Sequence, residues 1–89
     1  MPIEDKFTVR IVNLRKKFED KIGVTKKKSF SKQLSSNYEE DDTYSFYKNS
    51  YKFLSEHVHG RKELQNEENL KELDHIERTI DLVNLKKKV

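Results

Sequence analysis

The side chains of this 89-residue sequence that could do chemistry gather between residues 54 and 61, in the stretch Leu-Ser-Glu-His-Val-His-Gly-Arg. His57 and His59 lie two positions apart and are followed by Arg61, with Lys52 just upstream. Histidine titrates near neutral pH and can act as a general acid or base, while a nearby Arg or Lys stabilises a phosphate. These four residues are therefore the candidate catalytic site, and metal-independent cleavage of RNA is the reaction that they suit.

Other site chemistries find less support in the same stretch. Residues two apart on a helix point about 200° apart, so His57 and His59 cannot bind one metal ion together. The sequence has no cysteine and no HExxH motif, and we expect no metal site. Ser55 and His59 could touch, but the glycine-rich elbow of a serine hydrolase is absent. With only Gly23 and Gly60 available, a phosphate-binding loop is excluded, and we expect no cofactor.

The elements that must position this cluster are helices, and the first is predicted over residues 3–22. Apolar residues recur there every three or four positions, which places them on one helix face. They are Ile3, Phe7, Ile11, Leu14, Phe18 and Ile22. The alternation of Phe7, Val9 and Ile11 with polar residues would also suit a short strand. The helix is favoured because its period runs longer and ends at Gly23, a natural helix cap.

Residues 24–41 are rich in Ser and Lys and predict a long loop, with a short helix near residues 30–34 as an alternative. The second helix is predicted over residues 42–59, starting after an aspartate cap and ending at Gly60. Its apolar stripe is Tyr44, Tyr47, Tyr51, Leu54 and Val58. The third helix is predicted over residues 66–86. Its stripe is Leu70, Leu73, Ile76, Ile80 and Val83.

These patterns predict an all-α protein, a small bundle of three main helices in one domain over residues 1–89. The second and third helices would form an antiparallel hairpin around Gly60. Only two glycines and one proline occur, fewer than a β-rich fold with many tight turns requires. The chemistry-bearing stretch lies at the turn of this hairpin.

Residues 50–60, Ser-Tyr-Lys-Phe-Leu-Ser-Glu-His-Val-His-Gly, resemble the Tyr-x-x-Leu-Ser-x-x-x-His segment of HEPN-like domains. The resemblance implies an all-α bundle, often dimeric, of a kind common in bacterial defence and toxin systems. It also implies RNA binding or metal-independent ribonuclease activity. The active motif of that family is an Arg followed a few residues later by a His. Here Lys52 takes the Arg position before His57, and Lys cannot make the planar bidentate contact of Arg with phosphate, which puts catalysis in doubt.

The charge is distributed unevenly along the chain. Residues 1–38 carry ten Lys/Arg and four Asp/Glu, a net charge of +6, and residues 39–42 are all acidic. A basic segment of this kind can attract nucleic acid or an acidic protein. The candidate partner-binding or nucleic-acid-binding residues are Arg15, Lys16, Lys17, Lys26, Lys27, Lys28 and Lys32.

The composition also bears on the size of the core and on location. With 33% hydrophobic and 39% charged residues, the core is thin, and docking on a protein partner or homodimer formation would stabilise it. No stretch approaches the roughly 20 apolar residues of a membrane span, and the first residues lack the pattern of a signal peptide. We expect a cytoplasmic protein that does not bind a membrane.

Three functions remain open on the sequence. The first is a non-enzymatic helical protein that binds a protein partner, as a regulator or inhibitor of phage or bacterial defence type. The second is an HEPN-like RNA-binding or ribonuclease domain using His57 with Lys52 and Arg61. The third is DNA binding through the basic first half. We rank partner binding first, because catalysis requires several groups in register whereas binding requires only a surface.

Overall fold

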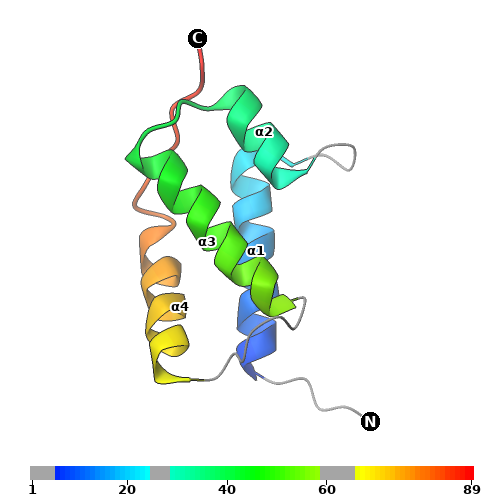
Figure 1. Ribbon diagram of the computed structural model, residues 1–89, viewed down its shortest axis with the longest axis vertical. Coiled ribbons are helices and arrows are strands. Elements are labelled where there is room, and N and C mark those ends of the chain that lie inside the picture. The colour runs from blue at the N-terminus through cyan, green and yellow to red at the C-terminus, as the bar shows by residue number, and fades with distance from the viewer. Residues whose placement is uncertain (1–5, 25–28, 59–65) are drawn as a thin grey trace.

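The computed structural model describes residues 6–24, 29–58 and 66–89. The helices of these segments are α1 (Lys6–Ile22), α2 (Phe30–Asn37), α3 (Asp42–Val58) and α4 (Glu67–Thr79). In Figure 1, α1 and α4 run in the same direction, α3 crosses them in the opposite direction, and α2 lies at the end of the molecule where α1 stops. The described part of the chain holds no strand longer than a single bridge, so the predicted all-α class is confirmed there.

The apolar stripe of α1 is the centre of the core. Phe7, Ile11, Leu14, Phe18 and Ile22 are all buried. Because helical positions three and four apart share a face, this stripe presents a continuous apolar edge, and α3 packs on α1 more extensively than any other helix does. Each such side chain contributes about 1.5–3 kcal/mol when it is fully buried. Gly23 ends the helix with φ of 70°, a conformation that costs glycine little.

The prediction of three main helices with a long loop over residues 24–41 is corrected, because part of that segment folds as α2, which includes the short helix near residues 30–34 that was the alternative. The Ser29 hydroxyl accepts a hydrogen bond from a backbone amide of the first turn at 3.2 Å and caps the helix. Phe30 and Leu34 lie four positions apart and are both buried. The Phe30 ring stacks on that of Tyr51 with 3.8 Å between centroids. Residues 25–28 of the predicted loop lie outside the described residues.

Aromatic side chains of α3 fill the space between α1 and α2. Asp41 caps α3 by accepting a hydrogen bond from the Tyr44 amide at 3.0 Å. Tyr47 is buried, and its ring meets that of Phe18 edge-on with 5.1 Å between centroids. Edge-to-face pairs of this kind add stability beyond the area that they bury. The last predicted residue of this helix, His59, lies outside the described residues, as does Gly60.

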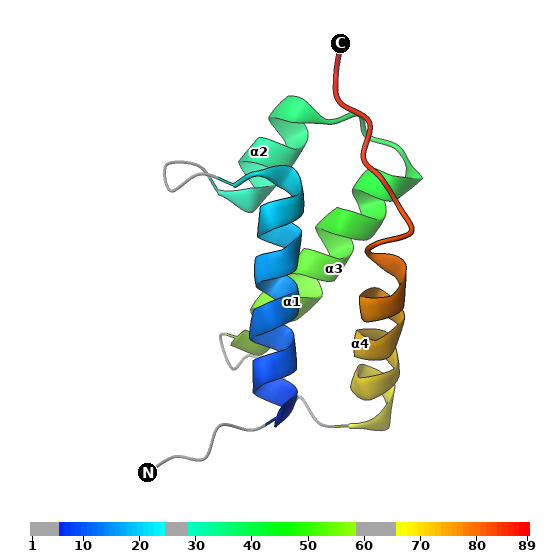
Figure 2. The same ribbon diagram turned by 180° about the vertical axis from the view of Figure 1, so that it is seen from behind.

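The third predicted helix, residues 66–86, is shorter than expected. α4 ends at Thr79, and the chain then turns and runs along the molecule toward α2, as Figure 2 shows from behind. Val83 and Leu85 both pack against the core, which fits the two-residue period of an extended segment better than a helix. The hydroxyl of Tyr47 donates a hydrogen bond to the Val83 carbonyl at 3.2 Å. These tertiary contacts outweigh the helical spacing of the apolar residues.

The end of the chain closes the molecule near α2. Lys87 forms an antiparallel β-bridge with Tyr38. The Glu39 amide donates to the Lys86 carbonyl at 2.7 Å, and the Lys88 amide donates to the Asn37 carbonyl at 2.8 Å. The end of the third predicted helix, near residue 86, therefore belongs to an extended segment that pairs with the link between α2 and α3.

Candidate functional site

The structure describes two of the four predicted catalytic residues, His57 and Lys52, and does not bring these two together. His57 is only 3% exposed, and its ring packs edge-on against Phe53 and Phe7 with 4.5 and 6.0 Å between centroids. Lys52 is exposed and lies about 140° away from His57 around the axis of α3. A general acid or base must reach its substrate, and a core position does not provide that access. The remaining two candidates, His59 and Arg61, lie outside the described residues.

The predicted basic residues that the structure describes lie on more than one face. Lys17 faces the turn after α4, where its Nζ lies 2.6 Å from a carboxylate oxygen of Asp81. Lys16 is exposed on the outer side of α1, and Lys32 is exposed on α2. Residues 26–28 lie outside the described residues. The described basic residues are therefore divided among separate faces, and nucleic-acid binding through the whole set stays a prediction.

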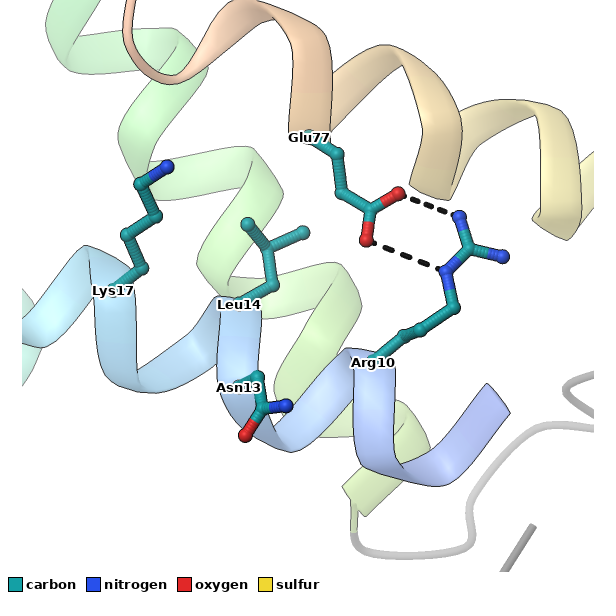
Figure 3. A pocket seen from close by; sticks show the side chains of 5 residues that line it. All are labelled: Arg10, Asn13, Leu14, Lys17 and Glu77. Atoms are coloured by element: carbon teal, nitrogen blue, oxygen red, sulfur yellow. Dashed lines mark hydrogen bonds and ion pairs between the residues drawn. The ribbon is translucent and has the colours of Figure 1, made fainter. Parts of the chain in front are cut away.

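Arg10 forms the strongest charged contact between α1 and α4. Its Nε and Nη2 donate to the two carboxylate oxygens of Glu77 at 3.3 and 2.5 Å, and Nη2 lies 2.7 Å from Asp74. Figure 3 shows the paired side chains across a hollow that Asn13, Leu14 and Lys17 also line. The hydrogen bonds that Arg10 donates to Glu77 raise the pKa of Arg10, so the guanidinium stays charged.

A second charged contact holds the far end of α4 to the same side of α1. Asp81 accepts Lys17 at 2.6 Å and Lys21 at 3.1 Å. The hydrogen bond from Lys17, with that from Lys21, lowers the pKa of the Asp81 carboxyl. Both contacts use the charges of α1 to position another helix of the same chain. This side of α1 is therefore an internal interface.

The outer side of α1 carries exposed apolar side chains instead. Val9 and Val12 are 37% and 49% exposed, and Val58 at the end of α3 is 39% exposed. One hollow is lined by Val12 and Val58 together with Arg15, Lys16 and Glu19. A second hollow shares Val12 and is lined by Thr8, Val9, Val12 and Asn13. We call Val9, Val12 and Val58 the valine patch, with Arg15 and Lys16 as its basic rim.

Arg15 of the basic rim is held in place by contacts with α3. Its Nε donates to the Ser55 hydroxyl at 3.3 Å, and the guanidinium lies over the ring of Tyr51, 5.1 Å from its centroid. The hydroxyl of Tyr51 donates to Glu19 at 3.2 Å. Burial raises the pKa of Tyr51, so it remains a neutral donor in this set. Arg15 is thus fixed beside the patch and loses less conformational entropy on binding than a fully mobile side chain would.

The sequence prediction missed the valine patch, although a signal for it was present. Val9 and Val12 fall off the apolar stripe that defines the buried face of the first helix. Two valines on an otherwise charged helix face are unusual, and Val9 was considered only as a strand residue. Val58 was assigned to the buried stripe of the second predicted helix. Which face a helix leaves exposed depends on its neighbours, and the sequence pattern does not contain that information.

Searches for similar proteins do not place the chain in a family. No family model, no curated protein and no solved structure matches it. The HEPN-like resemblance therefore stays a prediction. Within the described residues, no helix has the length and apolar character of a membrane span, and no three His, Asp or Glu side chains gather as a metal site would require.

Proposed function

We propose that this protein is a non-enzymatic helical module that binds a protein partner through the valine patch. The observation that carries the proposal is the convergence of Val12 and Val58, from two different helices, on one hollow with a basic rim. Single exposed apolar residues are normal on protein surfaces. Three valines around adjoining hollows form a contiguous apolar surface, which is typical of an interaction site when polar residues surround it.

The surroundings of the patch suit a protein interface. Interfaces combine an apolar centre with a polar rim, and arginine is enriched in them. Thr8, Asn13 and Glu19 surround the valines together with the basic rim. Burial of the valines on a partner would contribute roughly 25 cal/mol for each Å² of apolar area removed from water.

Site-specific photocrosslinking in lysate of the source organism tests this proposal. A photoreactive amino acid replaces Val12, and a second variant carries the same group in place of Glu72, an exposed residue of α4. We expect the group at position 12 to capture one protein in preference to others, identified by mass spectrometry. The group at position 72 should not capture that protein, because Glu72 does not belong to the valine patch and a partner bound there would not contact it.

The control for specificity is the Val9→Asp change in the chain that carries the group at position 12. A charge placed in the centre of the patch should prevent capture, because it would have to be desolvated against apolar side chains. Equal capture from positions 12 and 72, or capture unaffected by Val9→Asp, would rule out the valine patch as the binding surface.

A further inference from the structure

The way α4 binds α1 shows what kind of surface the charges of α1 accept. Leu73, Ile76 and Ile80 of the α4 segment are buried in the core. The carboxylates beside them reach Arg10, Lys17 and Lys21 of α1 through Asp74, Glu77 and Asp81. One side of α1 is therefore joined by ion pairs to the carboxylates of α4 and of the turn that follows it. Inside this molecule, the cations on that side of α1 are paired with an acidic segment whose apolar side chains are buried in the core.

The outer side of α1 carries the same kinds of side chain, apolar residues beside cations, and no described helix pairs carboxylates with them. It offers Val9 and Val12, with Val58 beside them, where the other side has its apolar contact. The cations of the outer side are Arg15 and Lys16, and they correspond to the paired cations on the side that faces α4. Neither Arg15 nor Lys16 forms an ion pair with any residue that the structure describes. The surface therefore retains an apolar stripe and two cations that form no ion pair within the described chain, and Glu19 is the one carboxylate that lines the same hollow.

The length of this surface also fits a helical partner. Val9 and Lys16 are seven positions apart in α1, which corresponds to about 10 Å along the helix axis. About two turns of a docked helix span that distance when it crosses α1 at a shallow angle. A partner helix with apolar residues spaced three and four apart would present a stripe of matching length.

Charge argues against the two other classes of occupant. A second copy related by two-fold symmetry would bring the same surface against itself, and each copy would contribute two rim cations against the single carboxylate of Glu19. Like charges at that position would repel each other. A nucleic acid would gain from the two cations but not from the valines, since phosphate contacts are electrostatic and the apolar floor offers no base-stacking ring.

We propose that the partner docks an acidic amphipathic helix on the valine patch, with its apolar stripe on Val12 and Val58 and its carboxylates on Arg15 and Lys16. This proposal rests on the proposed function and names the chemistry of the partner. It predicts that affinity falls with increasing salt, because rim charges at a surface are screened.

Fluorescence anisotropy with defined probes tests the chemistry of the partner. The probe is a labelled helical peptide with leucines at positions i, i+3, i+4 and i+7 and glutamates on both sides of that stripe. Three comparison probes are the same peptide with lysine in place of glutamate, a scrambled glutamate peptide, and a single-stranded RNA. We expect the glutamate peptide to bind more tightly than all three, by about tenfold or more.

Variants of the full chain locate the binding. Val12→Asp should lower the affinity for the glutamate peptide at least about tenfold. Lys16→Glu should lower it about fivefold, and the effect of Lys16→Glu should diminish at high salt. The matched controls are Leu82→Asp, at an exposed leucine away from the patch, and Lys48→Glu, at an exposed lysine of α3. Both controls should leave the affinity unchanged. Circular dichroism of each variant establishes that it folds.

The outcomes separate this proposal from the one before it. Equal affinity for the lysine peptide, tighter binding of RNA, or no binding of the glutamate peptide would overturn the acidic-helix proposal. If the crosslink at position 12 captures a partner while the glutamate peptide does not bind, the surface stands and the chemistry assigned to its partner is wrong. If the crosslink fails as well, both proposals fall.

Discussion

At the scale of single residues, this fold uses polar aromatic side chains as core packing groups. Tyr47 is 2% exposed, and its hydroxyl reaches the Val83 carbonyl, so a buried polar atom is satisfied by the segment that follows α4. His57 lies edge-on against Phe53 and Phe7 and fills space between α3 and the start of α1. The residue type that most suggested catalysis thus contributes to the core.

The Tyr47→Phe change should destabilise the protein by about 0.5–1.5 kcal/mol at neutral pH, because the Val83 carbonyl loses its donor. Burial raises the pKa of Tyr47 above its ordinary value of 10.0. Below that value both folded and unfolded states hold the proton. As the pH rises above it, the unfolded state loses the proton first, so the contribution of this group to stability falls.

Urea unfolding between about pH 7 and pH 11 measures this effect. The free-energy difference between wild type and Tyr47→Phe should shrink as the pH passes 10, because phenylalanine has no proton to lose. The matched control is Tyr44→Phe, at a half-buried tyrosine one turn earlier in α3. Parallel curves of unfolding free energy against pH for wild type and Tyr47→Phe would contradict the claim that the raised pKa of Tyr47 contributes to the pH dependence of stability.

At the scale of elements, α1 has three sides with three different uses. Its apolar stripe packs on α3, its Arg10 side binds the carboxylates of α4, and its outer side carries Val9 and Val12. Of these three sides, only the apolar stripe was predicted from the sequence, because the helical spacing of apolar residues is a local signal. The division of its charges between α4 and the outer surface depends on tertiary packing, and sequence spacing does not encode it.

A double-mutant cycle with Arg10→Gln and Glu77→Gln should give a coupling of about 0.5–1 kcal/mol, decreasing with salt. The side chains of Arg10 and Glu77 are 36% and 35% exposed, so solvent screens the pair and limits its value. The control pair is Lys71 and Glu67 within α4, at 76% and 85% exposed and 3.6 Å apart. Its coupling should stay below about 0.5 kcal/mol. Chemical denaturation measures both cycles, and equal couplings would show that the α1–α4 contact has no special role.

At the scale of the whole molecule, the extended segment after α4 completes the core at the α2 end. Val83 and Leu85 pack against the buried residues, and Lys87 pairs with Tyr38. This closure connects α4, the α2–α3 link and α3 in one contact region, as Figures 1 and 2 both show. Local sequence patterns do not predict this closure, because its contacts join residues that are far apart in the sequence.

A chain that stops after Leu82 should be less stable by about 2–4 kcal/mol, because it loses two partly buried apolar side chains and several backbone hydrogen bonds. Urea unfolding monitored by circular dichroism measures the loss. The control removes only Val89, which is fully exposed and should change stability by less than about 0.5 kcal/mol. Similar stabilities for the wild type and the longer truncation would mean that the segment does not contribute to the core.

The all-α class and the buried stripe of the first helix could be predicted, because a period of three to four residues is a local property of the chain. α2 was missed as a main helix because only Phe30 and Leu34 give it an apolar face in a Ser-rich stretch. The third helix was drawn too long because Val83 continues the helical spacing, whereas the core contact of that residue decides its conformation. Ser50, Leu54 and His57 share a face by spacing, and that signal could have placed His57 in the core.

The pairing of the C-terminal segment with the α2–α3 link also bears on the order of events in folding. The hydrogen bond from Lys88 Nζ to the Ser35 carbonyl joins residues 53 positions apart, and α3 and α4 lie inside that loop. Closing a long loop costs chain entropy before its contacts repay the cost, while individual helices form within about a microsecond. During synthesis α1, α2 and α3 can therefore collapse on one another first. The α2 end of the core stays open until residues 86–88 have left the ribosome and sealed it.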